Sequence, residues 1–304
     1  MIGRVIEIAS VGRHLARERG SMTVFHEDVE EGRVPLDDIG VLLCNVRDLT
    51  YSNDLMIELA RRGVAVVLCG ENYLPVAWIW PLEGNHIQAL RMRRQLTASL
   101  PLCKRLWQAI VKAKITQQKN TLELLGVSSE NLGELVKRVR SGDPDNVEAQ
   151  AARRYWPLLF GGSFRRERFG PMPNPLLNYG YTVLRAATAR AVVSAGLHPS
   201  LGIHHRNRTN SMCLVDDLVE PFRPLVDYTV AGLVAAGRQD MSREVRRDLA
   251  AVLMMDLGTE RGTSPLQTCL ARAAQSLAQS FEVGKPELIL PGGPRCSAAD
   301  AMNA

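Results

Sequence analysis

The chain has 304 residues, a hydrophobic fraction of 46% and a formal net charge of +5. This length suits one large domain or two ordinary ones, and the hydrophobic fraction is enough to bury a substantial core. The charge alone favours a polyanionic partner only weakly, and no apolar run approaches the length of a membrane span.

Six cysteines are scattered along the chain without a Cys-x-x-Cys pair: Cys44, Cys69, Cys103, Cys213, Cys269 and Cys296. Their spacing argues against a zinc ribbon and against a disulfide scaffold. The first residues lack the charged and then apolar design of a secretion signal. We therefore expect a soluble, cytoplasmic protein with reduced thiols and no membrane partner.

The first 80 residues are predicted to form a small β-rich domain whose role is packing or dimerisation. Apolar runs predict four short strands, at residues 5–8, 22–26, 39–44 and 64–69. One helix is predicted from Asp54 to Arg62, with Ser52 as its N-cap and Gly63 ending it in a left-handed conformation.

A linker is predicted at residues 81–86, where proline, glycine and asparagine cluster. From there apolar residues recur at helical spacing, and strand signals vanish, which predicts an all-helical catalytic domain at residues 87–284. Residues 285–304 are rich in proline and glycine and are predicted to form an extended tail that is mobile at its end. The predicted fold class is α+β.

A basic stretch opens the helical region, with no acidic residue between positions 86 and 122. Its eight members are Arg91, Arg93, Arg94, Lys104, Arg105, Lys112, Lys114 and Lys119. Most such stretches are solvated helix faces, but those faces usually mix both signs of charge. The imbalance indicates contacts with phosphates, as does a second cluster formed by Arg165, Arg166 and Arg168.

Three segments contain the residues that can carry chemistry. In the first, Glu148 follows Asp145 with the spacing of a capping box, which is a structural alternative to a functional role. Glu148 also lies at the edge of an apolar helix face that begins at Ala152, which is a plausible place for a ligand.

The second segment holds the adjacent histidines His204 and His205. Neighbouring residues in a helix point about 100° apart, so at most one of them faces a given site. The third segment places Asp216, Asp217 and Glu220 beside apolar residues, where unpaired carboxylates would be costly. Either aspartate can share a helix face with Glu220, and a cation or a nearby arginine, Arg223 above all, would relieve their charge.

Two carboxylates and one imidazole, without a thiolate, suit Mn²⁺ or Mg²⁺ better than structural zinc. Such metals assist phosphodiester chemistry, and a nucleic acid backbone is the natural substrate beside a basic surface. The sequence contains neither a Gly-x-x-x-x-Gly-Lys loop for nucleotide hydrolysis nor a Gly-x-Ser-x-Gly elbow.

At these residues the sequence resembles the universal CRISPR-associated spacer-acquisition integrase family, in the form found with type II systems. The resemblance covers nearly the whole chain. Four stretches carry it: residues 148–156, 174–181, 202–205 and 217–224. It implies a β-rich N-terminal domain, a larger helical catalytic domain and a homodimer. It also implies that Glu148, His205 and Glu220 bind the metal and form the catalytic site, while a role of Asp217 as a further ligand stays open.

The reaction that the resemblance implies is a metal-dependent transesterification with Mg²⁺ or Mn²⁺. A 3′-hydroxyl of the incoming DNA attacks a phosphodiester at the boundary of the CRISPR repeat, so that the fragment becomes a new spacer. The implied partners are double-stranded DNA, as prespacer and as repeat, a small CRISPR-associated adaptation protein and the type II effector nuclease.

Two other functions remain open from the residues alone. A metal-dependent nuclease that acts on branched or single-stranded DNA during repair would use the same side chains, with water in place of the 3′-hydroxyl. A non-catalytic DNA-binding scaffold would instead pair its carboxylates with arginines.

Overall fold

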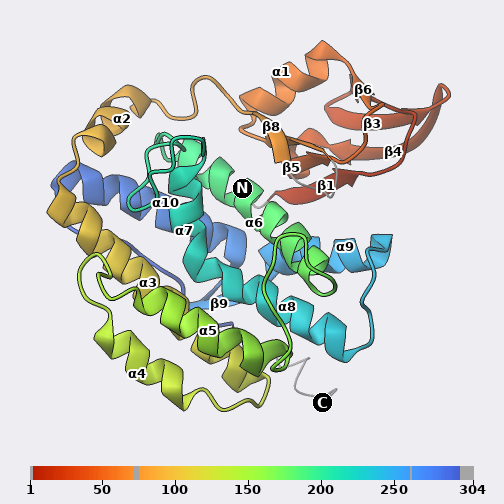
Figure 1. Cartoon of the computed structure of the whole chain (residues 1–304). Helices are drawn as coiled ribbons and strands as arrows, with labels where there is room; N and C mark the ends of the chain where they lie inside the picture. The colour runs from red at the N-terminus through yellow and green to blue at the C-terminus, as the bar shows by residue number, and fades with distance from the viewer. Residues whose placement is uncertain (1–2, 71–74, 261, 295–304) are drawn as a thin grey trace. The chain divides into compact units, whose positions relative to one another are not determined.

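A computed structural model of the chain describes residues 3–70, 75–260 and 262–294, except the side chains of residues 130 and 131. The chain divides into two compact units, residues 1–86 and 87–304. The N-terminal unit carries two sheets, and the second unit is largely helical (Figure 1). The predicted α+β class is therefore confirmed. Among the described residues, no helix is long and apolar enough to cross a membrane.

The N-terminal unit consists of two four-stranded sheets and one helix. One sheet has the strand order β1-β5-β7-β8 and the other β4-β3-β2-β6. The strands are β1 (Arg4–Ile8), β2 (Arg13–Glu18), β3 (Ser21–His26), β4 (Val29–Pro35), β5 (Ile39–Cys44), β6 (Thr50–Tyr51), β7 (Ala65–Cys69) and β8 (Pro75–Ile79), with the 3-10 turn η1 (Leu36–Asp38) and the helix α1 (Asn53–Arg61). The four strands and the helix that the sequence predicted are all present.

Local chemistry explains the elements that were predicted. Every residue of β5 is buried, and β5 pairs in parallel with both β1 and β7, which is the setting for a continuous apolar run. Ser52 caps α1 by accepting a hydrogen bond from the Leu55 amide. Gly63 has a φ of +65°, so the predicted left-handed stop of α1 is confirmed.

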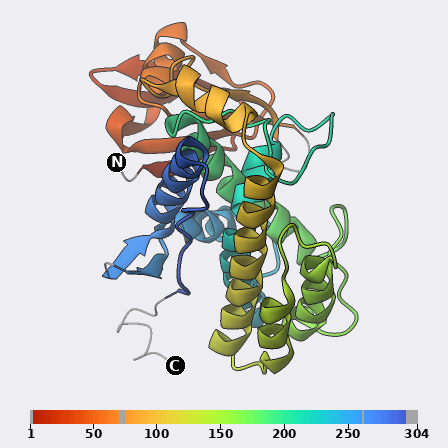
Figure 2. The same cartoon turned by 90° about the vertical axis from the view of Figure 1, so that its left-hand side faces the viewer.

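The second unit contains nine helices in its described residues. They are α2 (Gln88–Leu96), α3 (Leu100–Leu124), α4 (Glu130–Arg138), α5 (Val147–Phe160), α6 (Asn174–Ser194), α7 (Cys213–Val219), α8 (Arg223–Ala235), α9 (Arg243–Ala250) and α10 (Leu266–Val283), with the 3-10 turns η3 (Glu220–Phe222) and η4 (Ala251–Met254). The helix α3 contacts α4, α5, α7, α8 and η3, and it runs alongside α4 and α5 in both views (Figures 1 and 2). It is the element against which the site is assembled.

The second unit is not all helical, which corrects the prediction. Strands β9 (Asp256–Thr259) and β10 (Gly262–Pro265) form an antiparallel hairpin. The tail joins it, because Pro294 bridges to Leu257 and the Gly292 amide donates to the Gly258 carbonyl. These strands are only four residues long, so they lack a clear period in the sequence. The predicted extended tail thus pairs with the hairpin at residues 292–294, and its end, with Cys296, lies outside the described residues.

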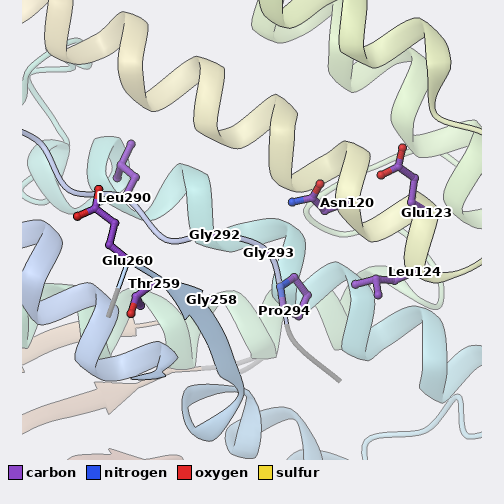
Figure 3. A pocket seen from close by; sticks show the side chains of 10 residues that line it. All are labelled: Asn120, Glu123, Leu124, Gly258, Thr259, Glu260, Leu290, Gly292, Gly293 and Pro294. Carbon is purple, nitrogen blue, oxygen red and sulfur yellow. The ribbon is translucent and has the colours of Figure 1, made fainter. Parts of the chain in front are cut away.

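A cavity of about 600 Å³ lies between the end of α3, the hairpin and the tail (Figure 3). The side chain of Gln117 ties the tail to α3 by donating to the carbonyls of Pro291 and Gly292. None of the residues that line this cavity belongs to the three segments that the sequence singled out as able to carry chemistry.

The basic stretch is not one helix face, as the sequence suggested. It is split between α2 and α3 at residues 97–99, where Ser99 caps α3. Arg91 is buried and donates to Glu282 at 2.7 Å and to the Ala195 carbonyl at 3.0 Å. Lys114 also points inward, toward two carboxylates. Only part of the stretch is therefore available to a polyanion.

Candidate functional site

Glu148 is presented by the first turn of α5, but not through the predicted capping box. The N-cap is Asn146, and Glu148 is the second helical residue rather than the third. The amides of Val147 and Glu148 donate to the two carboxylate oxygens of Asp143 at 2.9 and 3.0 Å. Asp145 instead pairs with an arginine at the surface. Because Asp143 satisfies the helix end, the Glu148 carboxylate is left for another partner.

The three carboxylates of the third segment have different partners. Asp216 pairs with Arg185 at 2.6 Å, Asp217 is turned toward the histidines, and Glu220 accepts from Arg223 at 2.8 Å. At Glu220 the chain tightens from α7 into η3. Each side chain has found its own cationic or hydrogen-bonding partner, so the pairing of Glu220 with Arg223 that the sequence left open is present.

The histidines lie in a loop rather than in a helix, and a buried carboxylate folds that loop. Asp217 is fully buried and accepts from the amides of Ile203, His204 and His205 at 2.5, 2.9 and 3.1 Å. A Cβ on Gly202 would stand 2.9 Å from Asp217 Oδ2, so glycine is required where the loop wraps the carboxylate. The Gly-x-x-His pattern therefore has a structural cause.

Asp217 also fixes the ring of His205. The Nδ1 atom of His205 lies 2.6 Å from Asp217 Oδ1, and an ionised carboxylate only accepts, so Nδ1 donates. In a neutral imidazole the Nε2 atom then carries the free lone pair. The hydrogen bond that His205 donates to Asp217, opposed by partial burial, raises the pKa of His205 above its ordinary value. Asp217 is thus engaged entirely within the protein and positions His205.

His204 stacks on an aromatic ring of α3 and meets the ring of His205 edge-on, with centroids 5.5 Å apart. The rings of His204 and Trp107 are stacked at 4.2 Å with an interplanar angle of 3°. Trp107 is buried and meets His205 edge-on, with ring centroids 5.6 Å apart. The two histidines therefore point differently, and His205 is the one beside the carboxylates.

Lys114 links the two glutamates, and it was not singled out from the sequence. Its Nζ lies 2.5 Å from Glu148 Oε1 and 2.5 Å from Glu220 Oε2. Burial by itself lowers the pKa of Lys114, but the charges of Glu220 and Glu148 outweigh it and raise the pKa. A lysine among Ile110, Val111 and Ile115 was the available signal, because a charge on an apolar helix face needs a buried partner.

Glu220 is more enclosed than Glu148, Lys114 and His205. Burial raises the pKa of Glu220, yet Arg223 and Lys114 together overcome it and lower the pKa to about 2. Its buried Oε2 atom forms an ion pair with Lys114 Nζ at 2.5 Å and accepts no hydrogen bond from any other residue that the structure describes.

His205 and Glu220 line one cavity of about 330 Å³, together with Tyr181, Arg185 and Arg223. Both Glu220 and Glu148 contribute to the raised pKa of His205, so the three side chains lie within electrostatic reach of one another. Among the described residues, no three His, Cys, Asp or Glu side chains are gathered closely enough to hold a metal ion as they stand. The ammonium of Lys114 stands between the two carboxylates instead.

A second buried carboxylate, Asp227, holds Tyr181, which lines this cavity. The sequence analysis did not single it out. Asp227 accepts hydrogen bonds from the hydroxyls of Tyr155 and Tyr181, and burial raises its pKa to about 6. The Arg223 guanidinium lies 4.3 Å from the centre of the Tyr181 ring. Arg223 is therefore held from two sides, by Glu220 and by the aromatic ring.

The three arginines of the loop before α6 have different surroundings. Arg166 donates to the side chains of Asn174 and Asn178, and burial lowers its pKa, so it serves the loop itself. Arg165 donates to carbonyls of its own loop but is exposed, and so is Arg168, which lies over the Phe169 ring. Two of the three arginines thus remain accessible to a polyanion.

Replacing Asp217 by asparagine is expected to loosen the histidine loop and lower the pKa of His205. Asparagine offers one acceptor oxygen where the carboxylate serves three amides and a ring, so we expect a loss of about 3 kcal/mol in the free energy of unfolding. Urea denaturation gives the stability, and an NMR titration gives the imidazole pKa. Asp216→Asn is the matched control, and an unchanged His205 pKa in Asp217→Asn would contradict the positioning role.

The raised pKa of His205 sets the sign of its pH dependence. The pair with Asp217 contributes stability below the ordinary pKa of histidine, and this contribution is lost as the pH rises through the raised pKa.

A comparison with protein-family models and a comparison with known sequences give the same family. A family model described as CRISPR associated protein Cas1 matches residues 6–264. The chain is 37% identical over 277 residues to a CRISPR-associated endonuclease Cas1 of Neisseria meningitidis serogroup C, which covers 90% of this chain and 89% of the relative.

Solved structures show the same fold at low sequence identity. A casposase bound to an integration product has a TM-score of 0.79 at 19% identity and covers 99% of this chain and 98% of that one. A Cas6-RT-Cas1–Cas2 complex has a TM-score of 0.72 at 18% identity and covers 93% of this chain and 35% of the matched chain.

Proposed function

Because the chain belongs to the Cas1 family of CRISPR-associated endonucleases, we propose that it inserts foreign DNA fragments into a CRISPR array as new spacers. The observation that carries this function is the convergence of Glu148, Glu220 and His205. Lys114 draws the two glutamates together, and His205 and Glu220 line one cavity. These residues come from three separate segments, so their meeting is a product of the fold.

The donor set fits a divalent metal that prefers oxygen ligands. Glu220 has a buried carboxylate oxygen whose partner among the described residues is the Lys114 ammonium, and its low pKa keeps the group ionised. His205 offers Nε2 because Asp217 engages Nδ1. We propose that Glu148, His205 and Glu220 hold Mg²⁺ or Mn²⁺. The bound ion would polarise the scissile phosphate and stabilise the charge that develops on the attacking and leaving oxygens.

The proposed reaction is a transesterification in which the DNA supplies the nucleophile. The 3′-oxygen of the incoming fragment forms a bond to a phosphorus at the repeat boundary, as the bond from that phosphorus to its former 3′-oxygen breaks. One ester replaces another, and the proton of the attacking hydroxyl ends on the departing oxygen. No nucleotide hydrolysis is needed, in keeping with the lack of a phosphate-binding loop in the sequence.

The chain's own residues orient this chemistry. Asp217 holds the imidazole in one orientation, and Asp143 fixes the helix end that presents Glu148. Arg223 lines the cavity beside Glu220 and is braced by the Tyr181 ring, so part of its guanidinium faces the space where a phosphate would enter. Such fixed donors reduce the reorganisation required in the transition state.

Arg165 and Arg168 are proposed to contact the DNA backbone. Replacing both by glutamate is expected to weaken DNA binding and reduce the slope of log affinity against log salt by about two, roughly one per lost phosphate contact. Fluorescence anisotropy across a salt series measures this slope. Arg243→Glu on α9 is an exposed control with the same change of charge per residue. An unchanged slope in the double variant would remove these arginines from the DNA surface.

The proposed partners follow from the family and from the neighbours' names. One neighbour is a complex of Cas1 with Cas2 and another is a casposase bound to an integration product. We propose that this chain acts as a homodimer, that the small adaptation protein Cas2 bridges two such dimers, and that prespacer and repeat are double-stranded DNA. In the type II form that the sequence resembles, the effector nuclease of the same locus is a further proposed collaborator.

Product analysis separates this function from the two alternatives. Joined strands indicate integration, whereas shortened strands without joining indicate a repair nuclease. A scaffold would bind DNA without either product, and Mn²⁺ would leave its melting temperature unchanged. A site that binds the metal in the folded state is stabilised by mass action.

A further inference from the structure

Lys114 occupies the space between the carboxylates that the proposed function assigns to a metal. Its ammonium touches Glu148 and Glu220 at 2.5 Å each, and its side chain is only 12% exposed. It projects from the middle of α3, where Ile110 and Val111, one turn before it, are apolar and buried. A lysine is rarely enclosed in this way unless its charge is matched.

The charges around Lys114 balance without any other cation. Glu148 and Glu220 bring two negative charges, and Lys114 and Arg223 bring two positive ones. A divalent ion that entered this neutral group would leave an excess of positive charge in a largely buried place, which is costly. One of the two cations must therefore leave the carboxylates when a metal binds.

Lys114 is the cation that can leave. Arg223 is held by Glu220 and by the Tyr181 ring, and its planar guanidinium is fixed by both contacts. Lys114 has a flexible stem of four carbons, and among the described residues its ammonium pairs with the two carboxylates alone. Displacing the ammonium frees one oxygen on each glutamate for a ligand bond.

Helix α3 offers a new acceptor for the displaced ammonium. Gln118 lies four residues after Lys114, so the two side chains are neighbours on one face of the helix. Side chains on a helix lean toward its N-terminus, which brings Gln118 back toward Lys114. In the described part of the chain, the buried Oε1 atom of Gln118 accepts no hydrogen bond.

We propose that Lys114 is a resident counter-ion that holds Glu148 and Glu220 together in the metal-free protein and is displaced toward Gln118 when the divalent ion binds. This inference rests on the metal site of the proposed function. It adds a competition between two cations for the same carboxylates. The measured metal affinity then depends on how much more strongly Glu148 and Glu220 bind the divalent ion than they bind the Lys114 ammonium.

Metal binding without any DNA tests the competition directly. The full-length wild type, Lys114→Met and Lys114→Gln are titrated with Mn²⁺, and free Mn²⁺ is followed by electron paramagnetic resonance. Removing the competing charge is expected to tighten Mn²⁺ binding by about tenfold or more in both variants. Both variants should melt lower than the wild type without metal, and Mn²⁺ should raise their melting temperatures by more than it raises that of the wild type.

Lys112→Met is the matched control, because it removes the same charge from a position about 160° away around α3. It should change Mn²⁺ affinity much less than Lys114→Met. Gln118→Leu should weaken Mn²⁺ binding when Lys114 is present and have no effect in the Lys114→Met background. Gln118→Leu without effect in both backgrounds would overturn the displacement toward Gln118.

Mn²⁺ binding that is equal or weaker in both Lys114 variants than in the wild type would overturn the competition and leave Lys114 as a structural ion pair. If the wild type itself binds no Mn²⁺, and neither Lys114 variant does, the metal site of the proposed function fails. The two failures are therefore distinguishable.

Discussion

Replacing Glu148 by glutamine is expected to lower the rate of strand transfer by about 10²-fold or more while the protein remains folded. Glutamine keeps an oxygen that can accept from Lys114, and the end of α5 is satisfied by Asp143 rather than by Glu148. The change removes the negative charge with which Glu148 is proposed to bind a divalent ion. The rate of joining of a duplex with free 3′-hydroxyls to a repeat-bearing plasmid measures the effect.

Glu134→Gln is a suitable control for this variant, because Glu134 is exposed and pairs only with Lys137 on its own helix in the described structure. It should join DNA at the wild-type rate. Wild-type activity in Glu148→Gln, with an unchanged melting temperature in both variants, would exclude Glu148 from the chemistry.

Glu220→Ala is expected to lower the free energy of unfolding by about 3–5 kcal/mol, the largest stability effect predicted for the site. In the described structure, the change leaves the largely buried Lys114 paired with Glu148 alone and removes the carboxylate partner of the partly exposed Arg223. Removing one member of a buried ion pair costs more than the pair contributes, because the remaining charge is unmatched. Urea denaturation followed by far-UV circular dichroism reports on the helical unit.

The sign of the pH dependence of Glu220 follows from its depressed pKa. Its pKa falls from 4.5 to about 2 in the folded protein. The carboxylate therefore contributes stability above its unfolded pKa, and this contribution is lost as the pH falls through the folded value. The stability difference between wild type and Glu220→Ala should shrink below about pH 4.5. Asp216→Ala, at a partly exposed pair, should cost clearly less, and an equal loss in the two variants would contradict the buried-pair explanation.

The strands that the sequence predicted are those whose chemistry is local. β5 and β7 are apolar runs, and a run of this kind is visible without knowing its neighbours. β2 and β4 were missed because they carry charged residues on partly exposed surfaces. Their strand character comes from pairing with β3 on either side, which is a long-range property. The hairpin β9–β10 was missed because its strands are only four residues long and show no clear period.

The residues of the site could likewise be identified from local patterns, whereas the contacts between their segments could not. Glu148, His205 and Glu220 were singled out because their segments combine into a recognisable set. The structure brings Glu148 and Glu220 to one ammonium and His205 and Glu220 to one cavity. The helical geometry assumed for the histidines was wrong, since the loop is shaped by the buried Asp217.

Lys114, Trp107 and Asp227 act through partners far away in the sequence. Lys114 was counted with a basic surface because the sequence shows the charge of a lysine but not where its side chain points. Trp107 fixes His204 by stacking. Asp227 accepts hydrogen bonds from Tyr155 and Tyr181, and the Tyr181 ring contacts Arg223. Such roles depend on how helices pack, and no spacing within one segment encodes them.

The most direct test of the integrase function is a strand-transfer assay with the wild type and His205→Ala. The protein and Cas2 are mixed with a short duplex with free 3′-hydroxyls and a plasmid that carries the cognate repeat, with Mn²⁺ or with EDTA. We expect joined products with the wild type and Mn²⁺, and their loss both with EDTA and in His205→Ala. Joining that persists in EDTA or in His205→Ala, or degraded DNA without joining, would contradict a metal-dependent integrase centred on His205.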